Sequence, residues 1–323
     1  MGCSNDISNE KNGTKRIEDL EEDIKLEGVE TNGKKEKQEK SEKKEKQKKN
    51  VTNEIIITMD ISEDKNNLNK ELYLLSPEHD FSSEINEKNT EMFINGKKTS
   101  FAKQYKFTKK GSYEIKYKFS IKLSNCEYLF YNCSSLQKID LSQLDSDNVN
   151  NMFEMFGFCD SLTSVNLSDF NTSNVTNMAS MFIGCENLSE LDLSSFNTEK
   201  VTNMASMFFS CSRLKSLNIS NFNTKKVTNM EQMFGQCLSL EKLDVSHFNT
   251  DNVTLVKKMF FRCEKLEELD LSSLNFAKVV NSSQLLLASK NIKKIIIDKK
   301  KGNSKVIIEE CKYADLNDNI VYK

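Results

Sequence analysis

Six cysteines recur at a constant spacing of 26 residues, and thiols are the most reactive side chains that this sequence repeats. They are Cys133, Cys159, Cys185, Cys211, Cys237 and Cys263. In a stack of coils, neighbouring thiols would lie about 5 Å apart, close enough for disulfides. Zinc sites instead use close pairs such as C-x-x-C, which this ladder lacks. We expect small, buried, free thiols, a state that a reducing compartment favours.

A column of acidic and amide side chains recurs with the same period and indicates a binding surface. Its members are Asp140, Asn166, Asp192, Asn218, Asp244 and Asp270, with Glu190, Lys242 and Glu268 beside them. These residues alternate with apolar ones, so they are expected on the outward side of strands. Solenoids commonly bind partners on such a face, and we predict that these residues contact a protein. The other interpretation is a polar sheet surface with side-chain hydrogen-bond ladders.

Nothing in the sequence has the pattern of a catalytic centre. It has no glycine-rich phosphate loop, and its conspicuous polar residues recur with the repeat. His79 and Asp80 follow Pro77 in a predicted loop, without a second histidine nearby to complete a metal site or triad. We therefore expect no enzymatic activity, no metal and no cofactor. An enzyme with its site in residues 51–121 is the alternative.

The repeat from Met178 to Ser195 indicates which elements position these side chains. Its apolar residues first fall at Met178, Met181, Phe182 and Cys185, and these spacings predict a short helix. Leucines and polar residues then alternate, which predicts a strand with one buried face. One such coil leaves both of its flat sides uncovered, so neighbouring coils must stack on it. Self-similarity at this period is typical of a solenoid.

The repeat resembles that of the BspA-like leucine-rich-repeat family, M-F-x-x-C-x-x-L-x-x-L-D-L-S-x-F-N-T-x-x-V-T-N-M. The resemblance extends over about residues 123–298. It implies a leucine-rich-repeat solenoid and a surface or adhesion protein without enzymatic activity, as found in bacteria and protists. Phenylalanine stands where the commoner leucine-rich repeat has asparagine, so the turn after the strand should differ from that repeat.

The first residues, Met1-Gly2-Cys3-Ser4, predict a lipid anchor. Gly2 is the acceptor type for myristoylation and Cys3 is a typical palmitoylation partner, and two acyl chains anchor a protein stably. Asp6 departs from the myristoylation motif, which has Ser or Thr at that position. Two alternatives remain: an unmodified N-terminus, and a bacterial lipoprotein in which Cys3 carries the lipid.

Charge composition points to a membrane surface as one partner and argues against nucleic acid. The chain has 323 residues, 29% of them charged, with a net charge of −2. Lysines outnumber glutamates in the run Lys34–Lys49, which could contact anionic lipid, although a solvated spacer is the competing interpretation. Aromatic residues do not interleave this run, so no nucleic acid is expected as a partner. We predict peripheral attachment to the cytoplasmic face of a membrane, with the cell surface as the alternative.

These patterns divide the chain into four parts. Residues 1–50 are predicted to be a disordered tail, 51–121 a small all-β cap, 122–298 the repeats and 299–323 a C-terminal cap. The expected fold is an α/β repeat solenoid, a right-handed stack of about seven parallel strands with short helices. In the first cap, strand patterns occur at residues 55–61, 71–75, 90–94, 100–107 and 112–121. In the second, they occur at 306–308 and 320–322.

Overall fold

The computed structural model describes residues 51–62, 66–76, 84–301 and 304–323. Thr52–Lys323 form one compact unit. The predicted tail with Gly2, Cys3 and Lys34–Lys49 lies outside the described residues, as do His79 and Asp80. Among the helices that the structure describes, none is long and apolar enough to cross a membrane.

The N-terminal part of this unit is an antiparallel arrangement of six strands. They are β1 (Glu54–Ile61), β2 (Glu71–Tyr73), β3 (Thr90–Ile94), β4 (Lys97–Thr99), β5 (Gln104–Lys106) and β6 (Gly111–Phe119). Asn95 and Gly96 have φ angles of 48° and 75°, so they form the tight turn between β3 and β4. The strand expected over residues 100–107 is therefore wrong in extent. Within this range the structure has only β5, at Gln104–Lys106, and the strand that pairs with β3 across the turn is β4, before residue 100.

Strand β1 joins this part to the first coil of the repeats. It pairs antiparallel with β6 on one side and with β7 (Lys138–Asp140) on the other, with Ile57 opposite Ile139. The resulting sheet has the order β4-β3-β6-β1-β7-β8. Its inward side chains, Ile57 and Tyr117 among them, belong to the same buried core as the coils. The first coil therefore has no exposed strand edge at its N-terminal side.

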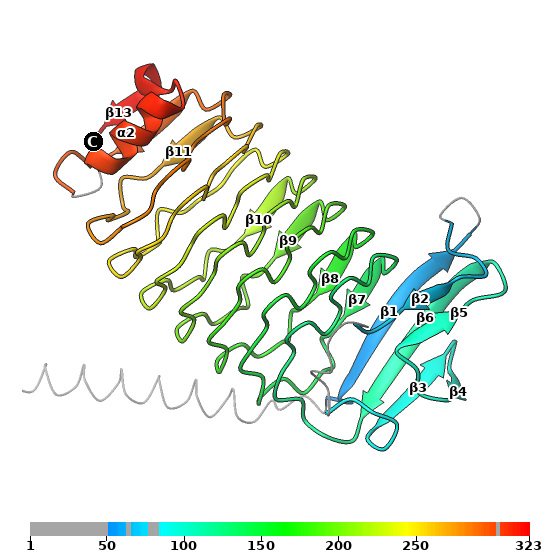
Figure 1. The fold of residues 1–323 in the computed structure, drawn as a ribbon. Helices are drawn as coiled ribbons and strands as arrows, with labels where there is room; N and C mark the ends of the chain where they lie inside the picture. The colour runs from blue at the N-terminus through cyan, green and yellow to red at the C-terminus, as the bar shows by residue number, and fades with distance from the viewer. Residues whose placement is uncertain (1–50, 63–65, 77–83, 302–303) are drawn as a thin grey trace, which may run out of the picture. The chain divides into compact units, whose positions relative to one another are not determined.

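The repeats form a β-solenoid of about seven turns (Figure 1). Further strands of the coils are β8 (Ser164–Asn166), β9 (Glu190–Asp192), β10 (Ser216–Asn218), β11 (Glu268–Asp270) and β12 (Lys294–Ile297). Parallel pairing joins β7 to β8, β9 to β10, and β11 to β12. In the described chain, no ladder joins β8 to β9, and Lys242–Asp244 forms no strand although the repeat predicts one. The sheet face is thus interrupted twice.

The short helices expected in each coil are absent, so the α/β classification is wrong. Met178–Cys185 instead makes consecutive turns, in which Met181, Ile183 and Cys185 donate N–H bonds three residues back. Ser180 and Gly184, in the same stretch, have φ angles of 55° and 70°. Left-handed residues interrupt a right-handed helix, although the apolar spacing of three and four is the same. Within the described ranges, the α-helix of the fold is α2 (Ser304–Tyr313).

These turns leave alternate N–H groups pointing toward the next coil. Met178, Ser180, Phe182 and Gly184 donate to the carbonyls of Asn203, Ala205, Met207 and Phe209, at 2.8–3.1 Å. The corresponding four bonds recur from the first coil, at Cys126, to the last, at residue 287. Because they satisfy backbone groups that would otherwise be buried without partners, they hold the coils together independently of the sheet face.

Inside the coils, equivalent side chains stack in columns. Phe130, Phe156, Phe182, Phe208, Phe234 and Phe260 form one column with ring centroids 5.1–6.0 Å apart and planes within 11° of parallel. All six rings are fully buried. Leu286 continues the column in the last coil, also fully buried. The 26-residue period therefore places the same side chain against itself throughout the core.

The C-terminal residues cover the last coil with a different element. Helix α2 buries Ile307 and Cys311, and a 3-10 turn, η1 (Asn317–Asn319), leads into β13 (Ile320–Tyr322). The strand expected at residues 306–308 is wrong, because these apolar residues lie on α2. The strand expected at 320–322 is confirmed: β13 pairs parallel with β12, at the end of the stack marked C in Figure 1.

The left-handed position at Gly184 generates a test of this architecture. A Cβ at Gly184 would lie 2.7 Å from Cδ1 of Phe158 in the preceding coil, and the backbone φ of 70° disfavours a side chain. We expect Gly184→Ala to lower the free energy of unfolding by about 1–3 kcal/mol in a urea titration. Ser210 occupies the same place in the next coil, so Ser210→Ala should change stability by less than about 0.5 kcal/mol. Equal effects of the two substitutions would contradict this packing.

Candidate interaction surface

The predicted column of acidic and amide residues lies at the ends of the strands from β7 to β11 and at the end of the equivalent segment Lys242–Asp244. At all six positions from Asp140 to Asp270, Oδ1 of this residue accepts the N–H of the serine two positions later, at 2.8–3.3 Å. Hydrogen bonds from the backbone and side chain of Ser194 hold the pKa of Asp192 below its ordinary value. Asp and Asn both make this turn, which explains why they interchange along the column.

Neighbouring members of the column also interact between coils. The Asn166 side-chain amide donates to Asp140 Oδ1 at 3.0 Å, so an amide beside a carboxylate replaces repulsion with a hydrogen bond. Asp244 and Asp270 interrupt the alternation of Asp and Asn. Burial raises the pKa of Asp270, but the Lys323 ammonium at 2.8 Å and Ser272 outweigh it, and the pKa is lowered.

Each interruption of the sheet coincides with a hollow. The smaller, about 480 Å³, lies between β8 and β9 and is lined by Asn166, Glu190 and Asp192 among others. The larger, about 940 Å³, lies around the unpaired segment Lys242–Asp244. Lost backbone pairing and open side-chain space therefore occur at the same places on the face.

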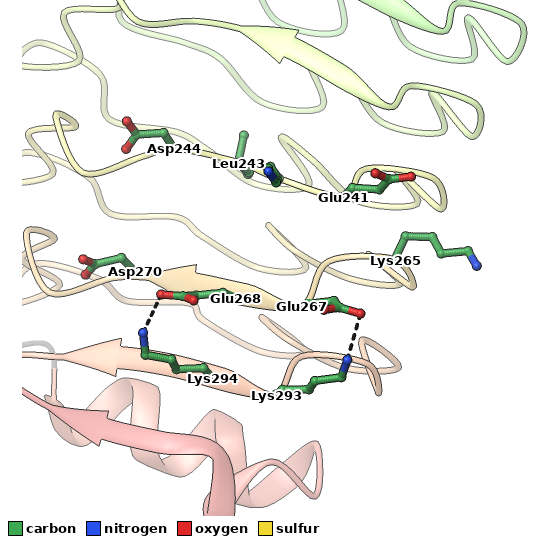
Figure 2. Close-up of a pocket in the computed structure, with 10 residues that line it drawn as sticks. Glu241, Leu243, Asp244, Lys265, Glu267, Glu268, Asp270, Lys293 and Lys294 are labelled. Carbon is green, nitrogen blue, oxygen red and sulfur yellow. Dashed lines mark hydrogen bonds and ion pairs between the residues drawn. The ribbon is translucent and has the colours of Figure 1, made fainter.

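The larger hollow, which we call the charged hollow, is lined by nine charged residues and Leu243 (Figure 2). The charged residues are Glu241, Lys242, Asp244, Lys265, Glu267, Glu268, Asp270, Lys293 and Lys294. Figure 2 shows Asp244 and Asp270 at one end, and Glu241 and Lys265 at the other. Lys293 pairs with Glu267 at 2.8 Å and Lys294 with Glu268 at 2.7 Å.

Several charges in the hollow have no intramolecular ion pair. Within the described residues, no salt bridge involves Glu241, Lys242 or Lys265. All three are exposed, whereas Leu243, next to Lys242 in the chain, is buried. One hollow thus presents both positive and negative side chains to an incoming molecule. This suits a partner that carries charges of both signs.

The structure brings together part of the predicted site. Lys242, Asp244, Glu268 and Asp270 line the charged hollow, and Asn166, Glu190 and Asp192 line the smaller one. Asp140 and Asn218 lie on β7 and β10, outside the linings of both hollows.

Sequence reasoning missed the other charged residues of the hollow. They are Glu241, Lys265, Glu267, Lys293 and Lys294. Glu241, Glu267 and Lys293 form a column one residue before the strand position of Lys242, so charge at that repeat position was the available signal. Among the described residues, no group of three or more His, Cys, Asp or Glu side chains is arranged to hold a metal ion.

The cysteine ladder is a structural hydrogen-bond column. Each thiol from Cys159 to Cys263 donates to the carbonyl of the phenylalanine in the preceding coil, at 3.1–3.2 Å. Ser289 takes the cysteine position in the last coil, and its hydroxyl donates to the Phe260 carbonyl at 2.6 Å. The described cysteines are free and buried, Cys133 included. A small side chain with a donor fits this position in every coil.

Two segments, residues 98–213 and 184–299, match the sequence model of a family described as "Mycoplasma protein of unknown function, DUF285". The chain belongs to this family. The DUF285 matches include the coils from β7 to β12, together with both hollows. No curated protein matches the chain.

Buried thiols make the stability of this DUF285 chain depend on alkaline pH. Burial raises the pKa of Cys211 and of Cys263 from 9.0 to about 12. Above pH 9 the unfolded thiols lose protons that the folded ones retain, so stability is full below pH 9 and falls as pH rises toward about 12. Cys211→Ser removes one such group. Between pH 9 and pH 11, we expect the unfolding free energy of the variant to fall less steeply than that of the unmodified chain. The two slopes should differ by about 1.4 kcal/mol per pH unit.

Denaturant titrations of both proteins from pH 7 to pH 11 measure this difference. Other titrating groups are common to the two proteins, so they cancel in the comparison. Parallel pH profiles would show that the Cys211 thiol ionises equally in both states, against the burial described above.

Proposed function

We propose that this DUF285 chain is a non-enzymatic scaffold that binds a protein through the sheet face of its solenoid. The charged hollow supports this proposal, because an interrupted sheet there leaves exposed charges of both signs that form no salt bridge with the part of the chain that the structure describes. Solenoids present such extended faces to partners. The opposite surface of each coil, formed by the consecutive turns of residues 178–185 and their equivalents, is here called the turn side. Its backbone groups are occupied by the hydrogen bonds that hold the coils together.

A protein suits this surface better than a small molecule. The charged hollow is open and lined mainly by charged side chains, whereas small-molecule sites are mostly apolar and enclosed. Mixed charge favours specificity and correct orientation of a partner that carries complementary charges. The BspA-like resemblance of the repeat favours the same class of function, because that family consists of surface and adhesion proteins.

We further propose a membrane anchor at the N-terminus. Gly2 and Cys3 would carry the acyl chains, and Lys34–Lys49 would add attraction to anionic lipid. Free cysteines in the coils favour the cytoplasmic face, which is reducing. The alternative, favoured by the BspA-like resemblance, is an extracellular lipoprotein or adhesin.

A charge swap tests the binding face. Glu241→Lys combined with Lys242→Glu leaves the net charge unchanged and disturbs no ion pair of the described residues. We expect the amount of partner protein that the tagged chain captures from its own cells to fall at least about tenfold. The melting temperature of the variant should equal that of the unmodified chain. Capture is quantified by mass spectrometry.

A matched control lies on the turn side. Glu231 and Lys257 face each other at 3.8 Å, and swapping them preserves both the pair and the net charge. Capture should be unaffected by this control. If the Glu241 and Lys242 swap leaves capture unchanged, or if the control abolishes it equally, the sheet face is not the binding surface.

The mass of the N-terminal peptide from native cells tests the anchor. We expect a myristoyl group on Gly2, with or without palmitate on Cys3, and loss of membrane association in Gly2→Ala. A diacylglyceryl group on Cys3 would instead support the surface lipoprotein. An unmodified N-terminus would contradict both forms of anchor.

A further inference from the structure

The strand β13 has an open edge at the end of the solenoid. The last sheet has the order β11-β12-β13, and no strand of the described residues pairs with the outer side of β13. Two side chains of β13 itself are exposed: Val321 and Tyr322 are each 44% exposed. An open edge beside exposed apolar side chains is a template for pairing with another chain.

The opposite open edge of the described fold is protected. Strand β4 is the outermost strand of the first sheet, and it carries Lys97 and Lys98, both exposed. Lysines on an edge strand oppose pairing with a second strand. The sequence of β13 is Ile-Val-Tyr, without lysine or proline. The lysines next to it are engaged within the fold: Lys323 bonds Asp270 and Ser272, and the Lys299 ammonium lies over the Tyr322 ring at 4.1 Å. The edge strands β4 and β13 therefore differ in whether they discourage a partner.

The backbone of β13 has donors and acceptors placed for an antiparallel partner. The Lys323 N–H donates to the Ile297 carbonyl. In this parallel register the backbone N–H and C=O groups of Val321 and Lys323 are directed toward β12, and those of Ile320 and Tyr322 are directed to the open side. The Ile320 N–H is already bonded to the Asn317 carbonyl. The outward groups left for a partner are the Tyr322 N–H, the Tyr322 carbonyl and the Ile320 carbonyl.

We propose that two copies of this chain associate through β13, antiparallel about a two-fold axis at Val321. Each Tyr322 N–H then donates to the partner's Ile320 carbonyl, giving two backbone bonds. The tyrosine ring lies opposite the partner's Ile320, an aromatic and β-branched pair of the kind that stabilises sheets. Val321 lies opposite itself at a non-hydrogen-bonded position, where side chains approach most closely.

Charge at the ends of this pairing is also self-complementary. In this register Lys323 of one copy lies opposite Asn319 of the other copy. Asp318 is the residue next to that Asn319. Asp318 forms no salt bridge with the described residues. Lys323 bonds Asp270 and Ser272 and has a third N–H donor left. A second copy thus fits this edge in hydrogen bonding, side-chain packing and charge.

Sedimentation velocity of the 323-residue chain, over a wide range of concentrations, tests the proposal. We expect a monomer–dimer equilibrium in the unmodified chain. Val321→Lys places two lysines opposite each other and should raise the dimer Kd at least about tenfold. Val321→Glu should do the same, and an equimolar mixture of the two variants should dimerise again. Thr99→Lys on β4 is the matched control and should leave the Kd unchanged.

Recovery in the mixture is specific to a site where residue 321 faces itself. A chain that stays monomeric at all concentrations overturns the proposal. So does a dimer that Val321→Lys leaves intact, or a failure of the mixed variants to associate. Circular dichroism and the melting temperature of each variant identify any loss of folding. Partner capture at the charged hollow is measured separately, so this proposal can fail without affecting the proposed function.

Discussion

The fold depends on the backbone hydrogen bonds that each coil donates to the next on its turn side. Alternate N–H groups can point along the stack only if the intervening residues form consecutive turns, and those turns require left-handed residues such as Ser180 and Gly184. The same geometry aligns equivalent side chains at a short repeat, so the phenylalanines stack and each cysteine reaches the phenylalanine carbonyl of the preceding coil. The constant 26-residue period is a consequence of this alignment, because an insertion in one coil would displace all of these contacts together.

Because the turn side holds the coils together, the sheet face is free to vary. Strand pairing is lost between β8 and β9 and around Lys242–Asp244, and the stack remains continuous at both places. Charged side chains gather around Lys242–Asp244, and some of them form no salt bridge within the described ranges. Structure and binding are therefore assigned to different surfaces of this repeat protein. The turn side determines how the coils stack, and the sheet face can change its charges without disturbing the core.

The sequence predicted the stacking, the buried columns and most strands, because those depend on a period and an alternation that are visible in the residues. It predicted helices wrongly at Met178 and its equivalents, because apolar spacings of three and four also arise from consecutive turns with left-handed residues. The sequence predicts a strand at residues 306–308, where the structure has part of α2, because three apolar residues do not distinguish a strand from part of a helix. The charged hollow was only half predicted: Lys242 and Asp244 lie in the visible column, but the loss of pairing that opens the hollow depends on contacts between coils.

We conclude that the turn side of the coils, and not the sheet face, holds them together. Native-state hydrogen exchange measured residue by residue by NMR tests it most directly. We expect the amides of Met178, Ser180, Phe182 and Gly184 to exchange slowly, near the rate of global unfolding, and those of Lys242–Asp244 to exchange much faster. Slow exchange at Lys242–Asp244 together with fast exchange at the four turn-side amides would contradict it.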